Sequence, residues 1–132
     1  MKKTIGLKFG GKKRIDVLIG EQVIPTDQTV ENGGRGAAPE PFQLFLASIA
    51  ACAGIYALEF CLNRGISTEG MKLTMECERD QKLKRYTSMS IHLKLPEGFP
   101  EKFQKAIIRS MNLCTVKKHI IVPPEFTITA GN

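Results

Sequence analysis

The feature that most constrains the fold is an uncharged stretch near the middle of the chain, from Leu44 to Leu58. It is rich in alanine and other small residues, and it carries a cysteine, Cys52, near its centre. Such a stretch has to be shielded from water, either by lipid or by protein. It is shorter than the roughly 20 apolar residues that a membrane-spanning helix needs, and Glu59 interrupts it. We therefore predict a helix in a protein core and no membrane partner.

The whole chain has the size and composition of a single domain, residues 1–132, that is large enough to bury a core. The basic start at Met1–Lys3 is followed by Lys8 rather than by an apolar run, so we predict no signal peptide and a cytoplasmic location. The net charge of +6 comes from dispersed basic residues, and the two tyrosines and no tryptophan offer little for base stacking. We therefore expect no nucleic-acid partner, and we hold binding of nucleic acid or of another acidic partner through the basic surface as a minor alternative.

The first half of the chain shows the alternation of apolar and polar residues that is typical of strands. Ile5–Phe9 and Ile15–Ile19 follow this period of two, which predicts a hairpin, and residues 22–25 are a candidate third strand. Residues 26–40 form a polar, glycine-rich loop that is long enough to suspect a functional role or mobility. A helix from Pro41 to Gly65 follows, because proline suits the first turn and glycine the C-terminal cap.

The second half predicts a second hairpin and a second helix. Residues 71–77 and 89–95 alternate as strands do, and apolar residues recur at three-four spacing from Phe103 to Cys114. Residues 126–130 alternate again and predict a last strand. The resulting order of elements predicts an α+β fold in which antiparallel sheets pack on two main helices.

Four cysteines are candidates for redox or metal chemistry. They show no CxxC or CxxH spacing, so we predict no metal site. Cys52 lies in the middle of an apolar helix, so it is either a small core residue or a thiol activated by a cation from elsewhere in the fold. Cys114 precedes Lys117–Lys118, whose charges either lower its pKa or form a solvated face. Cys61 and Cys77 fit core packing.

Cys52 and Cys114 lie on separate predicted elements and suggest a pair. In a two-cysteine peroxidase, one thiolate attacks the O–O bond and becomes a sulfenic acid, and the second thiol condenses with it to a disulfide. An external thiol then reduces the disulfide, so no metal and no bound cofactor is needed. The two sulfurs must lie close enough to bridge, which the sequence alone does not show.

Two segments resemble the OsmC/Ohr family of hydroperoxide reductases. GGRGAAPEPFQLFLASIAAC is similar to the family signature, in which a glycine-rich loop leads into P-x-E-L-L-x-A-x-x-A-x-C. NLCTVKKHI is similar to the segment that carries the family's second cysteine. The order of elements also matches over nearly all of the chain. The resemblance implies an OsmC-like fold and an intertwined homodimer, with a central apolar helix and active sites at the subunit interface.

By this resemblance the protein is a thiol-dependent peroxidase that reduces organic hydroperoxides in oxidative stress defence. Cys52 is then the peroxidatic cysteine and Cys114 the resolving one. The family activates the first thiol with an arginine that a glutamate holds. The matching positions here are occupied by Lys12 and Gln43, and Phe42 occupies the other position at which the glutamate is found. Lysine supplies charge but not the planar fork of an arginine.

This departure points to a less characterised branch of the family and leaves a second function open. Arg14, Arg35 and Glu40 lie close by in sequence and are alternative candidates for the activating groups. The alternative function is a non-enzymatic module of the same fold that binds a small apolar or sulfur-containing ligand at the dimer interface.

Overall fold

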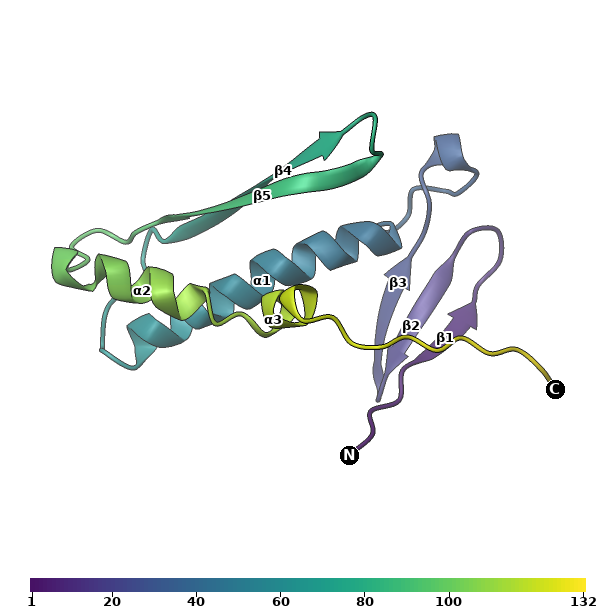
Figure 1. The fold of residues 1–132 in the computed structure, drawn as a ribbon, viewed down its shortest axis with the longest axis horizontal. Coiled ribbons are helices and arrows are strands. Elements are labelled where there is room, and N and C mark those ends of the chain that lie inside the picture. The colour runs from purple at the N-terminus through teal and green to yellow at the C-terminus, as the bar shows by residue number, and fades with distance from the viewer. The chain divides into compact units, whose positions relative to one another are not determined.

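A computed structural model describes all residues from Met1 to Asn132 and divides them into two compact units, Met1–Ala47 and Ser48–Asn132. The boundary falls within the long helix α1, so each unit contains part of it (Figure 1). The α+β class with antiparallel sheets is confirmed. The assignment of residues 1–132 to a single domain stays a prediction.

The first unit contains a three-stranded antiparallel sheet in the order β1-β2-β3. β1 spans Gly6–Phe9, β2 spans Ile15–Ile19 and β3 spans Gln22–Thr26, so the candidate third strand is confirmed. The turn between β1 and β2 contains Gly11 at φ 91° and Lys12 at φ 49°. Glycine enters this left-handed region without steric cost, which explains why Gly11 stands at the turn.

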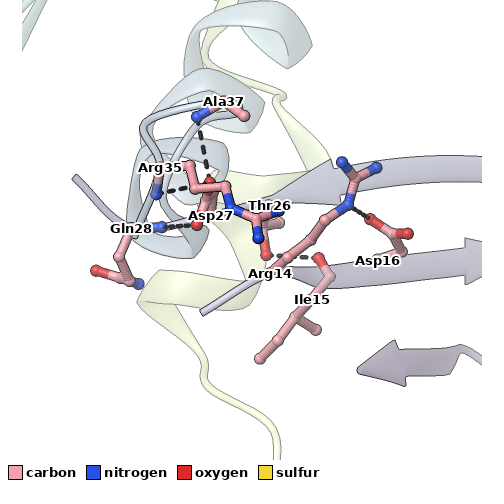
Figure 2. A network of polar contacts seen from close by, with 8 residues as sticks. All are labelled: Arg14, Ile15, Asp16, Thr26, Asp27, Gln28, Arg35 and Ala37. Atoms are coloured by element: carbon pink, nitrogen blue, oxygen red, sulfur yellow. Dashed lines mark hydrogen bonds and ion pairs between the residues drawn. The ribbon is translucent and has the colours of Figure 1, made fainter. Parts of the chain in front are cut away.

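The loop after β3 is organised around a buried carboxylate. Asp27 is 3% exposed, and its oxygens accept hydrogen bonds from the amides of Gln28 at 2.8 Å and of Arg35 and Ala37 at 3.2 Å (Figure 2). These hydrogen bonds, that of Gln28 first, hold the pKa of the Asp27 carboxyl below its ordinary value although burial opposes them. The loop includes the 3₁₀ turn η1 (Val30–Asn32). Its backbone is therefore held in place by hydrogen bonds to the Asp27 side chain.

The helix α1 spans Pro41–Leu62 and begins at the predicted proline. It ends at a reversal in which Gly65 has φ 64° and the Ile66 amide donates to the Cys61 carbonyl at 2.9 Å. By length and composition alone it could cross a membrane, with a mean hydropathy of 1.9, and 28% of its most apolar window is buried within the chain. Core helices of soluble proteins can have the same length and hydropathy, so the packing of α1 has to show which kind of helix it is.

The second unit contains a long antiparallel hairpin (Figure 1). Its strands are β4 (Lys72–Asp80) and β5 (Arg85–Lys94), close to the predicted ranges. The register places apolar residues opposite one another, such as Cys77 opposite Met89. The alternation seen in the sequence therefore corresponds to one apolar face of the hairpin.

The core of the second unit lies where α2 (Gln104–Met111) packs alongside the end of α1 (Figure 1). Ile107 of α2 is fully buried and clusters with Ala57, Phe60 and Cys61 of α1. This end of α1 is therefore a core helix, as predicted. Burial of the large side chains of Phe60 and Ile107 stabilises the fold by about 1.5–3 kcal/mol each.

The predicted helix through Cys114 is wrong in its extent, because α2 ends at Met111 and Cys114 lies beyond its end. A 3₁₀ turn, η2 (Glu101–Phe103), leads into α2, and a separate helix α3 spans Thr115–Ile121. Asn112, a poor helix former, follows the last residue of α2. Cys114 then leaves the helical conformation, with φ −44° and ψ 122°, and becomes the N-cap of α3.

The predicted last strand is also wrong. Residues 126–130 have no regular secondary structure, and Phe126 and Ile128 are 83% and 94% exposed. A strand needs a neighbour to accept and donate its backbone hydrogen bonds. Neither sheet in the chain pairs with this segment, so its alternating pattern has no sheet to join.

Candidate redox site

The structure brings together two of the four predicted site residues, Cys52 and Cys114. Cys52 is half-buried on α1, and Cys114 is 2% exposed at the start of α3. Both are free thiols, and a hydrogen bond joins their side chains. The packing of the second unit thus brings together two cysteines that are far apart in the sequence.

The turn that carries Cys114 is held by two hydrogen bonds from Lys117. The Lys117 amide donates to the Cys114 sulfur at 3.5 Å, and the Lys117 ammonium donates to the Asn112 side-chain oxygen at 2.7 Å. The ammonium is therefore engaged at the end of α2. The sequence left open whether the lysine charges lower the pKa of Cys114 or form a solvated face. In the structure, burial raises the pKa of Cys114 and Lys117 lowers it through its backbone amide, which neither interpretation included.

The two thiols have pKa values that are shifted in opposite directions. Burial raises the pKa of Cys52, but the amide of Val116, the thiol of Cys114 and the amide of Thr115 donate hydrogen bonds that lower it below its ordinary value. Burial raises the pKa of Cys114, and its hydrogen bond to Cys52 and the Cys52 charge raise it further, against the opposing amide of Lys117. Cys52 is thus the better thiolate and Cys114 the better proton donor.

The sequence left open whether Cys52 is a core residue or a thiol that a cation activates. The groups that lower its pKa are instead neutral donors, and all come from residues 114–116. Amide N–H groups leave no sequence signature, because every residue except proline has one. This part of the site could not have been predicted from residue types.

A further hydrogen bond that sequence reasoning missed joins α1 to α3. The Tyr56 hydroxyl and the Thr115 hydroxyl lie 3.2 Å apart. Tyr56 follows Cys52 by one helical turn, so both side chains lie on the same side of α1. That spacing was available in the sequence, but the partner on α3 was not.

The other two predicted site residues lie in the first unit. Lys12 is exposed in the turn between β1 and β2. Gln43 lies in the first turn of α1, where its side-chain oxygen accepts from the Glu40 amide at 3.1 Å. No hydrogen bond joins the two residues, and their roles stay predictions.

The alternative candidates for activating groups are engaged within the same unit. The Arg14 Nε donates to the Asp16 carboxylate at 3.0 Å, and the Arg35 charge acts on Asp27 (Figure 2). Glu40 contributes its backbone to the start of α1. The two arginine side chains and the backbone of Glu40 therefore make local structural contacts.

The remaining cysteines lie as predicted. Cys61 is fully buried in the core, and burial raises the pKa of its thiol despite the nearby Arg64. Cys77 is half-buried on the apolar face of β4. No group of three or more His, Cys, Asp or Glu side chains is placed to hold a metal ion.

An apolar cleft of about 670 Å³ lies within the second unit and reaches Cys114. Its walls come from α1, β5, α2 and α3, and residues on them include Ile49, Met89, Ile107, Met111 and Ile121. Cys114 lines the cleft, whereas Cys52 does not. Pockets of this size and apolar character accommodate small organic ligands.

Comparisons with known proteins relate this chain to OsmC-like proteins. Residues 33–129 match the family model described as OsmC-like protein. No curated protein matches the chain at a significant level.

Among solved structures, three similar ones are a protein of Psychrobacter arcticus assigned to osmotic stress induction and detoxification, an OsmC like protein of Mycoplasma pneumoniae, and the organic hydroperoxide resistance protein OsmC of Legionella pneumophila. Their identities are 22%, 13% and 21%, and their TM-scores are 0.75, 0.72 and 0.60. The matches cover 89%, 92% and 91% of this chain and 88%, 88% and 89% of theirs. At these identities the likeness establishes the fold.

Proposed function

We propose that this chain, which belongs to the OsmC-like protein family, is a thiol-dependent peroxidase that reduces organic hydroperoxides through Cys52 and Cys114. The observation that carries the proposal is the hydrogen-bonded pair of free thiols with pKa values shifted apart. An attacking thiol has to be a thiolate near neutral pH, and a resolving thiol has to lie within reach of it. The lowered pKa of Cys52 favours the first requirement, and the hydrogen bond between the two thiols favours the second.

The reaction proceeds in three balanced steps. The Cys52 thiolate attacks the distal oxygen of the hydroperoxide, the O–O bond breaks, and the alkoxide leaves and takes up a proton as an alcohol. Cys52 is now a sulfenic acid, and the Cys114 sulfur attacks the Cys52 sulfur, which forms a disulfide and releases water. A thiol reductant from outside the chain reduces the disulfide by exchange and becomes a disulfide itself.

The apolar cleft supports the choice of an organic hydroperoxide over hydrogen peroxide. Its mainly apolar wall accommodates an alkyl or aryl substituent and leads to Cys114, the partner of Cys52. The relative from Legionella pneumophila is described as an organic hydroperoxide resistance protein, which agrees with this substrate class. In a cell, such an enzyme would work in the reducing cytoplasm, where external thiols are available, as part of oxidative stress defence.

The proposal is tested by mixing the reduced protein with cumene hydroperoxide and dithiothreitol and following peroxide consumption. We expect catalytic consumption that exceeds the rate with dithiothreitol alone. With dithiothreitol left out, one equivalent of peroxide should produce a Cys52–Cys114 disulfide, identified by mass spectrometry of peptides from the unreduced protein. A protein that consumes no peroxide and forms no such disulfide would contradict the proposal.

A second function, a non-enzymatic module that binds a small apolar or sulfur-containing ligand, is favoured by one observation. Cys114 lines the apolar cleft, but Cys52, the better thiolate, does not. The same samples distinguish the two functions. Under the binding function, an apolar thiol or thioether raises the melting temperature of the protein, while cumene hydroperoxide is not consumed.

We also propose that the protein acts as a homodimer. The helix α1 exposes several large apolar side chains along its length: Phe42 (51%), Phe45 (38%), Ile55 (45%) and Leu62 (63%). Large apolar residues that a helix leaves exposed within its own chain are candidates for burial against a partner. A second copy of α1 is the partner that the family resemblance implies.

The dimer is tested by Ile55→Asp, which places a charge near the middle of this helix. We expect the wild-type protein to have the mass of a dimer in light scattering after size exclusion, and the variant to shift to the monomer mass. Burial of an unpaired carboxylate at an interface is strongly unfavourable, which is the reason for the shift. A wild-type mass equal to one chain would contradict the dimer. Leu83→Asp serves as the control, because Leu83 is also an exposed apolar residue but lies in the β4–β5 turn and not on α1.

A further inference from the structure

The start of α3 is attached to α1 beside Cys52 by the hydroxyl pair Tyr56–Thr115. Tyr56 lies one turn after Cys52 on α1, and its hydroxyl lies 3.2 Å from that of Thr115. Thr115 directly follows Cys114 and is the first residue of α3. The same short segment therefore supplies a contact to Tyr56, the second thiol, and two amides that face Cys52.

We propose that Tyr56 is a positioning residue, which holds the segment Cys114–Val116 against Cys52 through Thr115 and thereby controls how reactive the Cys52 thiol is. The helix α3 has only a few residues, and none of them is among the buried core residues of the chain. A direct tie to α1 at its first residue is thus an effective way to keep its amides at hydrogen-bonding distance from Cys52.

The other groups around the thiols fit this role. Lys117 also stabilises the turn at Cys114. Its amide donates to the Cys114 sulfur, and its ammonium donates to the Asn112 side-chain oxygen. The His119 ring nitrogen lies 2.7 Å from the Thr115 carbonyl, which holds the first turn of α3 to itself. The titratable groups that these elements place about the site are Cys114, Tyr56, Lys117 and His119. Of them, the Tyr56 hydroxyl is the one that ties α3 to α1.

The inference has one part that rests on the proposed function and one that does not. If the protein is a peroxidase, loss of the Tyr56–Thr115 tie also slows attack of Cys114 on the Cys52 sulfenic acid, because the two sulfurs are no longer held together. Alkylation of Cys52 in the reduced protein requires no peroxide. Failure of the peroxidase proposal would therefore leave the alkylation result unaffected.

The test compares four forms of the full chain: wild type, Tyr56→Phe, Thr115→Val and Thr115→Ser. Cys52 alkylation by iodoacetamide is followed by peptide mass spectrometry across a pH series. We expect Tyr56→Phe and Thr115→Val to react about fivefold more slowly at neutral pH, the effect of one hydrogen bond. Their pH profiles should also move to higher pH. Thr115→Ser keeps the hydroxyl and should match the wild type.

The double variant Tyr56→Phe/Thr115→Val should react no more slowly than either single variant, since both remove the same hydrogen bond. Thr74→Val, at an exposed position on β4, controls for loss of a threonine hydroxyl elsewhere. Unchanged alkylation rates and pH profiles in Tyr56→Phe and Thr115→Val would overturn the proposal. Thr115→Ser reacting as slowly as Thr115→Val would also overturn it. Circular dichroism of each variant confirms that it is folded before the rates are compared.

Discussion

Cys52→Ser is expected to reduce hydroperoxide consumption to the rate of dithiothreitol alone. A serine hydroxyl does not ionise near neutral pH, so the amides of Thr115 and Val116 and the Cys114 thiol have no thiolate to stabilise. The measurement is cumene hydroperoxide consumption at several protein concentrations, with the slope against concentration as the result. The wild-type slope should be positive and the variant slope indistinguishable from zero.

Cys114→Ser and Cys77→Ser complete this experiment. Cys114→Ser should still consume the first equivalent of peroxide, but without a resolving thiol its Cys52 sulfenic acid persists and excess peroxide oxidises it to the sulfinic acid. Cys77→Ser removes a half-buried thiol on β4 and should behave as the wild type. A Cys52→Ser protein as active as the wild type would exclude Cys52 as the attacking thiol.

Gly34→Ala is expected to destabilise the first unit strongly. An added Cβ would collide with the Gln28 carbonyl and lie 2.7 Å from the Asp27 side-chain oxygen. The contact is with backbone held by the Asp27 hydrogen bonds, which has little freedom to move aside. We expect a loss of about 3 kcal/mol in the free energy of unfolding, the upper part of the range for overpacking. The melting temperature should fall by on the order of 10 °C.

Gly6→Ala is the matched control for this variant. A Cβ at Gly6 would meet the Leu18 side chain at an ordinary contact distance of 3.7 Å. The control should therefore melt within a few degrees of the wild type. If Gly34→Ala melted with the control, the loop around Asp27 would have to be much more yielding than its hydrogen bonds indicate.

Much of the fold could be predicted from the sequence, because its patterns are local. Alternation predicted four of the five strands in the two sheets, and β3 was named as a candidate strand. The proline and glycine near the ends of α1 marked its limits. The errors occur where a local pattern depends on a distant partner. Residues 126–130 alternate as a strand does but have no neighbouring strand in the chain. The apolar spacing from Phe103 to Cys114 predicted one continuous helix and did not indicate that the helix ends at Met111.

The candidate site could be predicted only as a set of residue types. The resemblance to a family selected Cys52 and Cys114, and packing of the second unit places their side chains in contact. The sequence did not indicate Tyr56 or the amides of Thr115 and Val116. A hydroxyl on a helix and backbone amides contribute to a site only through the groups that they contact, and these contacts are made in the folded chain.

The sequence by itself determined the α+β class, the central helix and the candidate cysteine pair. These follow from the periodicity of apolar residues and from a signature spread over short segments. Only the tertiary structure decided which thiol has the lower pKa. The environment of a thiol depends on donors brought from elsewhere in the chain, and here the break after Met111 turns residues 114–116 toward Cys52. Periodicity describes one element at a time, whereas a pKa depends on all the groups that meet at one atom.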